Sequence, residues 1–186
     1  MTLENISIIG FLKFKWQAIN IIIRRFRYYY FFKSFDIILF RHLVCRFKPK
    51  SIAIGKRFTA LQNTVLEFNN TANIKIGNYC LLSYGVVMAV KGDLVMGDYV
   101  MVGEYSSIRD YTHDYSVSTI PMISSEEIIS PIKIGNNVWI GRGCIILPGT
   151  TIEDGVVIGA NSVVKGNLLA DSIYAGAPAI FIKKRI

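Results

Sequence analysis

A six-residue period of aliphatic side chains runs through most of the chain. In the C-terminal third the repeat positions follow one another without a gap: Ile134, Ile140, Ile146, Ile152, Ile158 and Val164. The same phase returns upstream in three groups of three: Ile54, Ala60 and Leu66, then Ile76, Leu82 and Met88, then Met96, Val102 and Ile108. Glycine often follows directly, as in Gly77 and Gly141. An α-helix has a period of 3.6 residues, so these positions do not form a helical face.

A period of six predicts short strands joined by sharp corners. The residue two before a repeat position is also small or apolar, as in Cys80, Val138 and Val156, which is expected where alternate strand residues point inward. Three units then make one turn of a triangular prism, with turns stacked at ~4.8 Å. We predict an all-β solenoid of about five coils over residues 51–186, ending in a C-terminal tail.

The repeat is interrupted once over a long segment. The unit that starts at Ile108 ends at His113, and the period resumes at Ile134, so residues 114–133 are predicted to form an excursion loop. Long polar loops on solenoids usually carry binding functions. The departure point, RDYTHDY, combines a base, acids, hydroxyls and aromatic rings in seven residues. We therefore expect the functional site at this interruption.

The repeat region resembles a known family over about residues 52–183. The resemblance rests on three motifs: PIKIGNNVWIGRGCIILPG, TIEDGVVIGANSVV and AGAPA. They are similar to those of the hexapeptide-repeat acyltransferases, in particular the sugar and polysaccharide O-acetyltransferases related to galactoside and xenobiotic acetyltransferases. The resemblance implies a left-handed parallel β-helix, a homotrimer with active sites at subunit interfaces, and acetyl-coenzyme A as the acyl donor. It also implies that the essential histidine stands at the base of the excursion, in a stretch such as the THDY of residues 112–115.

His113 is the expected general base. Imidazole titrates near neutrality, so it can take the proton of an acceptor hydroxyl that then attacks the acetyl group, without a covalent acyl-enzyme. An acidic side chain could orient the ring. The candidates for that role are Asp114, Asp110 and Asp93, and the residues expected to contact the acceptor are Arg109, Tyr111 and Tyr115. The chain has only two histidines, too few for the zinc site of β-helix carbonic anhydrases, so no metal is expected.

The resemblance also implies a coenzyme A groove between adjacent prisms. We expect the contacts to coenzyme A at the positions of this sequence that match the family's motifs, which are Trp139, Gly141, Arg142, Gly159, Ala160 and Lys165. Many relatives have a basic residue where Ile180 stands, so phosphate binding is expected from Lys183, Lys184 or Arg142 instead. The expected function is O-acetylation of a sugar hydroxyl in surface polysaccharide biosynthesis. The alternatives are a serine or amphenicol-type xenobiotic acetyltransferase and, from another class, a non-catalytic β-helix scaffold.

The distribution of charge adds information only about the first fifty residues. The net charge of +8 lies there, because residues 1–50 hold 10 Lys and Arg against Glu4 and Asp36, together with 12 of the 23 aromatic residues. Two amphipathic helices are predicted, over residues 12–30 and 32–47, to cap the solenoid and, as a second role, to contact an anionic membrane surface. Nucleic-acid binding is disfavoured because no binding motif accompanies the charge. No apolar run is long enough to cross a bilayer, so we expect a cytoplasmic protein, peripheral at the inner face of the membrane.

Overall fold

The computed structural model describes residues 37–39 and 43–186, and its regular structure there is almost entirely β-strand. A single short 3-10 helix, η1 (Met122–Ser124), interrupts the strands of the described part. The strands are β1 (Ile37–Leu39), β2 (Val44–Arg46), β3 (Ser51–Ile54), β4 (Phe58–Ala60), β5 (Val65–Phe68), β6 (Asn73–Ile76), β7 (Leu81–Leu82), β8 (Val87–Val90), β9 (Asp93–Met96), β10 (Met101–Val102), β11 (Ser107–Arg109), β12 (Tyr111–His113), β13 (Glu127–Ile129), β14 (Ile132–Ile134), β15 (Trp139–Ile140), β16 (Ile145–Ile146), β17 (Thr151–Ile152), β18 (Val157–Ile158), β19 (Val163–Val164), β20 (Asn167–Leu168), β21 (Ser172–Ala175) and β22 (Ile180–Lys184).

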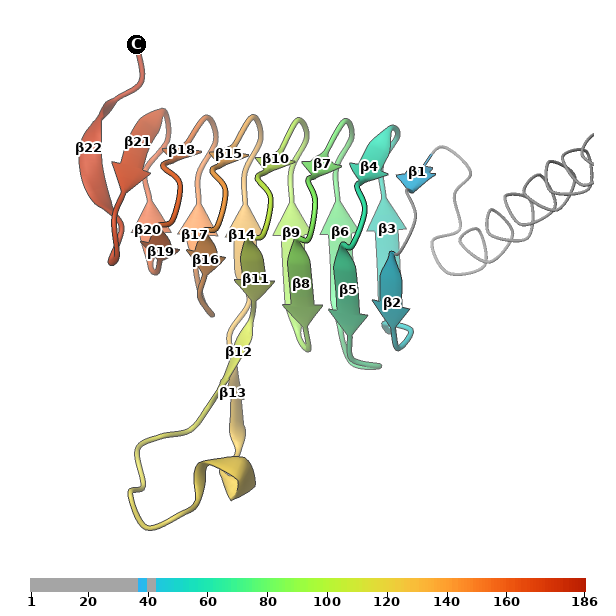
Figure 1. Ribbon diagram of the computed structural model, residues 1–186, viewed down its shortest axis with the longest axis vertical. Helices are drawn as coiled ribbons and strands as arrows, with labels where there is room; N and C mark the ends of the chain where they lie inside the picture. Colours follow the sequence, from blue (N-terminus) through green and yellow to red (C-terminus); the bar gives the residue numbers. More distant parts are fainter. Residues whose placement is uncertain (1–36, 40–42) are drawn as a thin grey trace, which may run out of the picture. The chain divides into compact units, whose positions relative to one another are not determined.

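Three parallel sheets form the faces of a β-helix (Figure 1). Face A contains β1, β4, β7, β10, β15, β18 and β21, and β22 pairs antiparallel at its end. Face B contains β2, β5, β8, β11, β16 and β19, and face C contains β3, β6, β9, β14, β17 and β20. The chain visits the faces in the order A, B, C in every coil, so the three edges of the prism are the AB, BC and CA edges. This arrangement confirms the predicted parallel β-helix.

The core is the column of side chains that the six-residue period placed inside. Every repeat position from Ala60 to Val164 is buried, and so are the residues two before, including Cys80, Val138 and Val156. Repeat positions stack coil on coil, since Leu82 pairs with Val102, which pairs with Ile140. Glycine is needed where coils approach at an edge: a Cβ on Gly103 would lie 2.5 Å from the backbone N of Arg142.

An amide and carboxylate ladder holds the CA edge together. The Oδ1 atom of each ladder residue accepts a backbone N–H from the coil before it. The pairs are Lys56 N to Asn78 at 2.9 Å, Asn78 N to Asp98 at 2.6 Å, Asp98 N to Asn136 at 2.9 Å and Asn136 N to Asp154 at 2.7 Å. Carboxylates alternate with neutral amides along this column, which keeps like charges from stacking directly.

The solenoid has six coils and a seventh strand on face A, one coil more than predicted. The additional coil is the first, formed by β1, β2 and β3, and its residues 37–39 and 44–46 are strands where a helix was predicted over residues 32–47. Leu39 and Cys45 occupy repeat positions, since they pair with Ala60 and Leu66 of the next coil. Tertiary pairing with β4 and β5 therefore decides the conformation here over the helical pattern. Strands β1 and β2 of this coil precede residue 51, and the helix predicted over residues 12–30 lies outside the described residues.

Extra residues are accommodated at the BC edge. In coils 1 to 3 they form short corners there, and in coil 4 they form a long excursion between β11 and β14 that stands out from the prism (Figure 1). The described part of the chain contains no helix long and apolar enough to cross a bilayer.

Candidate active site

The excursion is a β-hairpin at its base. Strands β12 and β13 pair antiparallel, with Tyr111 opposite Ile129 and His113 opposite Glu127. Backbone hydrogen bonds close it at both ends, from Ser130 N to Asp110 O at 2.7 Å and from Asp114 N to Glu126 O at 2.7 Å. The excursion therefore starts before residue 114, and the prism resumes at Ile132, not after Lys133. His113 accordingly lies on a paired strand instead of at a loop entrance.

The His113 ring is exposed and has a hydroxyl partner. Its Nδ1 lies 3.3 Å from Ser125 Oγ, and Ser125 Oγ donates to Met122 O at 2.8 Å. Since the one hydroxyl proton is used on Met122, the oxygen can only accept from Nδ1–H. We assign the tautomer from this network: Nδ1 carries the proton, and Nε2 holds the lone pair. Sequence reasoning missed Ser125 because it comes near the ring only through hairpin pairing and the turn of η1.

The three carboxylates predicted to orient the ring have other partners. Asp110 is fully buried and accepts the backbone N–H groups of Lys91 and Gly92 at 2.8 and 2.7 Å. Its burial raises the pKa of the Asp110 carboxyl, against the lowering effect of these hydrogen bonds. Asp114 Oδ1 accepts Ser116 N at 2.9 Å, a bond that lowers the pKa of Asp114.

Asp93 belongs to the prism, where its Oδ1 accepts Asn73 Nδ2 at 2.8 Å. Among the described residues, the hydrogen-bond partner of the imidazole is thus a hydroxyl and not one of the three predicted carboxylates. Asp110 instead ties the root of the hairpin to the preceding coil. Its bidentate acceptance of two backbone N–H groups explains why an acid is buried there.

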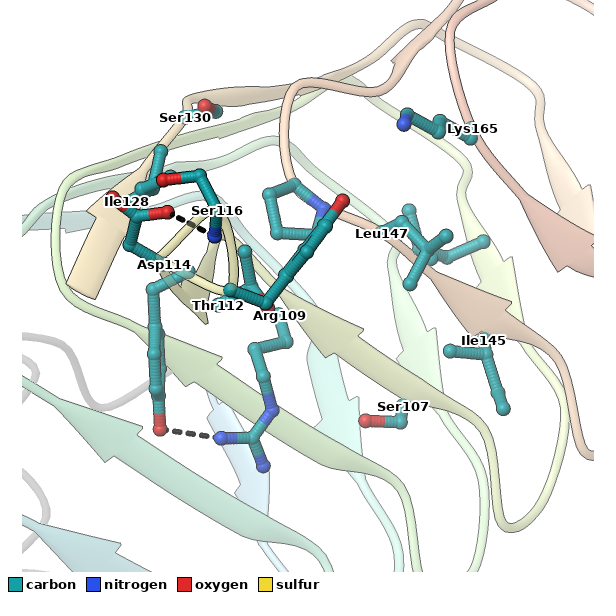
Figure 2. A pocket seen from close by; sticks show the side chains of 14 residues that line it. Ser107, Arg109, Thr112, Asp114, Ser116, Ile128, Ser130, Ile145, Leu147 and Lys165 are labelled. Carbon is teal, nitrogen blue, oxygen red and sulfur yellow. Dashed lines mark hydrogen bonds between the residues drawn. The ribbon is translucent and has the colours of Figure 1, made fainter. Parts of the chain in front are cut away.

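A pocket of about 640 Å³ opens beside the hairpin, on the side of the later coils (Figure 2). It is lined by Ser107, Arg109, Tyr111, Thr112, Asp114, Tyr115, Ser116, Ile128, Ser130, Ile145, Ile146, Leu147, Pro148 and Lys165. All three predicted acceptor contacts, Arg109, Tyr111 and Tyr115, are therefore in one pocket, together with Lys165. Figure 2 shows Lys165 and Leu147 on one side of the pocket and Asp114 and Ile128 on the other.

His113 lies on the opposite face of the hairpin from this pocket. Side chains alternate along β12, so Thr112 and Asp114 face the pocket while His113 points away with its cross-strand partner Glu127. Tyr111 sits at the root, where Arg109 Nη1 donates to its hydroxyl. The predicted base therefore does not line the pocket that contains the predicted acceptor contacts.

The residues predicted to bind coenzyme A fall into separate groups. Gly141, Arg142, Gly159 and Ala160 lie at the AB edge, and Lys165 lies at the BC edge, with face B between them. At the AB edge, Arg142 Nε lies 3.5 Å from Glu104 Oε1 in an exposed ion pair. At the C-terminus, Lys184 Nζ donates to Ala170 O at 2.8 Å.

Trp139 and Lys183 share a column on the outer surface of face A. Trp139 pairs with Val157, Val157 with Ile173, and Ile173 with Lys183 across the antiparallel β22. The indole is 52% exposed, which is unusual for so large an apolar side chain. This column is a row of apolar side chains that ends at a lysine. It lies on face A, opposite the BC edge where the hairpin leaves the prism.

Comparisons with known proteins agree with this fold. Residues 131–166 match the family described as bacterial transferase hexapeptide, six repeats. A protein of Escherichia coli named as a lipopolysaccharide biosynthesis O-acetyl transferase, WbbJ, is 33% identical over 139 residues, 70% of this chain and 66% of that protein. Galactoside O-acetyltransferase of Escherichia coli is 32% identical over 134 residues, 72% of this chain and 54% of that protein. The chain therefore spans less than two thirds of the length of these relatives.

Solved structures match over a larger part of the chain. A maltose O-acetyltransferase from Clostridium difficile is 29% identical, with a TM-score of 0.53 over 81% of this chain and 67% of that chain. A galactoside acetyltransferase in complex with coenzyme A matches with a TM-score of 0.56 over 80% of this chain and 64% of that chain, at 23% identity, which shows the fold alone. The match of residues 131–166 to the bacterial transferase hexapeptide, together with the six-residue period and the three-sided solenoid, shows that the described part of the chain has the hexapeptide-repeat fold.

Proposed function

We propose that the protein is an acetyl-coenzyme A-dependent O-acetyltransferase whose acceptor is a sugar hydroxyl in surface polysaccharide biosynthesis. The names of its relatives support acetyl transfer to sugars, and a structural neighbour binds coenzyme A. The observation that carries the proposal is the state of His113: an exposed imidazole on a projecting hairpin, with Nδ1 donating to Ser125 and the Nε2 lone pair left for a substrate proton. Such a ring suits general base catalysis near neutral pH.

The proposed reaction is a direct transfer. Nε2 accepts the proton of the acceptor hydroxyl while the hydroxyl oxygen forms a bond to the acetyl carbonyl carbon. A backbone N–H stabilises the negative carbonyl oxygen of the tetrahedral intermediate. The carbon–sulfur bond then breaks, and the imidazolium returns its proton to the departing thiolate, so that the products are the acetyl ester and coenzyme A. No acyl group becomes attached to the enzyme.

We also propose a homotrimer in which neighbouring subunits complete each site. The hairpin leaves at the BC edge, whereas Trp139 and Lys183 lie on face A, so a single prism cannot present them to one substrate. A threefold axis places the hairpin of one subunit against face A of the next. Mixing His113→Ala subunits with Trp139→Ala subunits tests this arrangement. Random trimers should regain about a quarter of wild-type activity if the residues come from different subunits, and none if both come from one.

Acceptor assays test the proposed function itself. Thiol release from acetyl-coenzyme A would be followed with galactosides, maltose, nucleotide-linked sugars, serine and an amphenicol, each at several concentrations. Faster release with a sugar, together with an acetyl mass increment on that sugar, supports the proposal. Turnover only with serine or the amphenicol would support the alternative enzymes. A protein that coenzyme A does not stabilise against heat, and that releases no thiol, would be a scaffold.

The basic aromatic N-terminal segment is proposed to hold the enzyme near a lipid-linked acceptor. The proposal rests on its charge and on its aromatic content. Because β1 and β2 belong to the solenoid, a truncation has to stop at residue 36 to leave the first coil intact. Co-sedimentation with anionic vesicles should be lost in that truncated chain, and equal sedimentation of both chains would contradict the proposal.

A further inference from the structure

Lys91 connects the catalytic hairpin to the preceding coil. It lies at the BC edge between β8 and β9, and its Nζ contacts both carboxylate oxygens of Glu127 on β13, at 2.6 Å to Oε1. Both side chains are about a quarter to a third exposed, which favours a stronger contact than that of a fully solvated pair. The ion pair therefore joins the returning strand of the hairpin to a rigid corner of the prism.

Tyr111 contacts two cations at the same root. Lys91 Nζ lies 4.1 Å from the centre of its ring, and Arg109 Cζ lies 4.8 Å from that centre, so both cations contact the aromatic ring. The ring is buried, and it belongs to β12, the outgoing strand that carries His113. One lysine thus contacts both strands of the hairpin, while its own backbone N–H is fixed by Asp110.

We infer that Lys91, Tyr111 and Glu127 form a clasp that positions His113, a role that rests on the proposed function. The three are positioning residues: Lys91 fixes Glu127, the first residue of β13, and this residue pairs with His113. Ser125, which contacts the His113 ring, lies two residues before β13. Without the clasp the hairpin keeps its own ladder and the Asp110 anchor but gains freedom to swing. His113 would then spend less time in the reactive position.

The clasp also controls which charges face the imidazole. Glu127 is directly opposite His113 across the hairpin. The side chains of such cross-strand partners are close enough for opposite charges to interact. Lys91 keeps that carboxylate at the root. The other acids of the hairpin are Asp114, engaged with Ser116, and Glu126, whose carbonyl accepts Asp114 N–H. Ser125 is the neutral partner of the ring. Removing the charge of Lys91 therefore frees one specific carboxylate beside the ring.

Lys91→Met and Lys91→Arg test the clasp, with Arg46→Met as the matched control. Arg46 Nη1 lies 3.3 Å from Glu67 Oε2 in another ion pair between neighbouring coils, which joins the first and second coils on face B, whereas the hairpin leaves the fourth coil. Hydrogen–deuterium exchange of the hairpin amides should be about fivefold faster in Lys91→Met, near wild type in Lys91→Arg, and unchanged in Arg46→Met. Exchange of the later coils should not change in any variant.

Kinetic measurements distinguish a clasp that positions His113 from one that only stabilises the fold. In Lys91→Met, kcat should fall about three- to tenfold, and Lys91→Arg should restore most of it. The acidic limb of kcat against pH should also move upward, because the freed carboxylate favours the protonated ring. Glu127→Gln should lower kcat without that upward movement, since no carboxylate is left opposite the imidazole.

Two results would overturn the inference. Hairpin exchange that is the same in Lys91→Met as in wild type would show that the ion pair does not hold the hairpin. Faster exchange with an unchanged kcat would show that the clasp does not position His113. If the wild-type protein transfers no acetyl group, the proposed function fails, and the exchange comparison alone still decides whether the clasp exists.

Discussion

Replacing Ser125 by alanine tests which nitrogen of His113, the proposed general base, carries the proton. The change removes the oxygen that accepts Nδ1–H at 3.3 Å and leaves the exposed imidazole free to carry its proton on either nitrogen. A ring with its proton on Nε2 cannot accept the acceptor's proton there. The variant should therefore bind acetyl-coenzyme A normally and turn over more slowly.

The expected loss follows from the geometry of the bond. A neutral hydrogen bond contributes about 0.5 to 1.5 kcal/mol, and 3.3 Å is slightly longer than the usual range of about 2.7 to 3.2 Å, so we expect about 0.5 to 1 kcal/mol. At 1.36 kcal/mol per factor of ten, kcat should fall about two- to fivefold. A charged orienting partner would have given a larger loss, because charge-assisted hydrogen bonds are about twice as strong.

The assay is steady-state thiol release with the best acceptor of the panel. Ser125→Thr keeps a hydroxyl and should retain most of the wild-type kcat, whereas Ser124→Ala changes the exposed neighbour in η1 and serves as the control. The KM for acetyl-coenzyme A should stay within about twofold of wild type in all three variants. The tautomer assignment is refuted if Ser125→Ala keeps its full kcat, or if Ser124→Ala loses as much.

Three further predictions concern stability. Asp110→Asn should cost about 1 to 3 kcal/mol in urea unfolding, because its amide nitrogen cannot accept one of the two N–H groups that meet the buried carboxylate; no loss would contradict that account. Gly103→Ala should cost about 1 to 3 kcal/mol or prevent folding, since its Cβ meets backbone of the next coil at 2.5 Å, and a melting temperature equal to wild type would exclude so close an approach. Hydrogen bonds from Asn136 lower the pKa of Asp154, so this carboxylate stabilises the fold above its ordinary pKa and loses that effect as pH falls through its folded pKa. The melting temperature of Asp154→Asn should lie below wild type at pH 6 and approach it near pH 3, and a constant difference would contradict this.

The regular part of the fold could be predicted because the residue type at each inward-facing position can be recognised without knowing its contacts in the neighbouring coils. A six-residue period needs only local information, namely a buried aliphatic residue and a small residue at the corner, as at Ile140 and Gly141. The first coil could not be predicted in this way. Its repeat positions Leu39 and Cys45 have the correct spacing, but no glycine follows either one, and aromatic and basic neighbours imitate a helical stripe.

The location of the candidate site could be predicted, but its internal geometry could not. The broken period points to the region of His113 and Arg109, and the structure brings Arg109, Tyr111, Tyr115 and Lys165 into one pocket. Strand pairing within the excursion then turns His113 to the other face of the hairpin. The contacts of Ser125 and Lys91 depend on residues far apart in sequence, and no spacing rule links them to His113.

Acetyl transfer by His113→Ala is the most direct test of the central claim. The measurement compares kcat for the wild-type protein and the variant with the same acceptor, after both are shown to melt at the same temperature. The account predicts a loss of about 10² to 10⁴-fold, as expected when a general base is removed, with coenzyme A still bound. Near-normal turnover by the folded variant would contradict the assignment of His113 as the base.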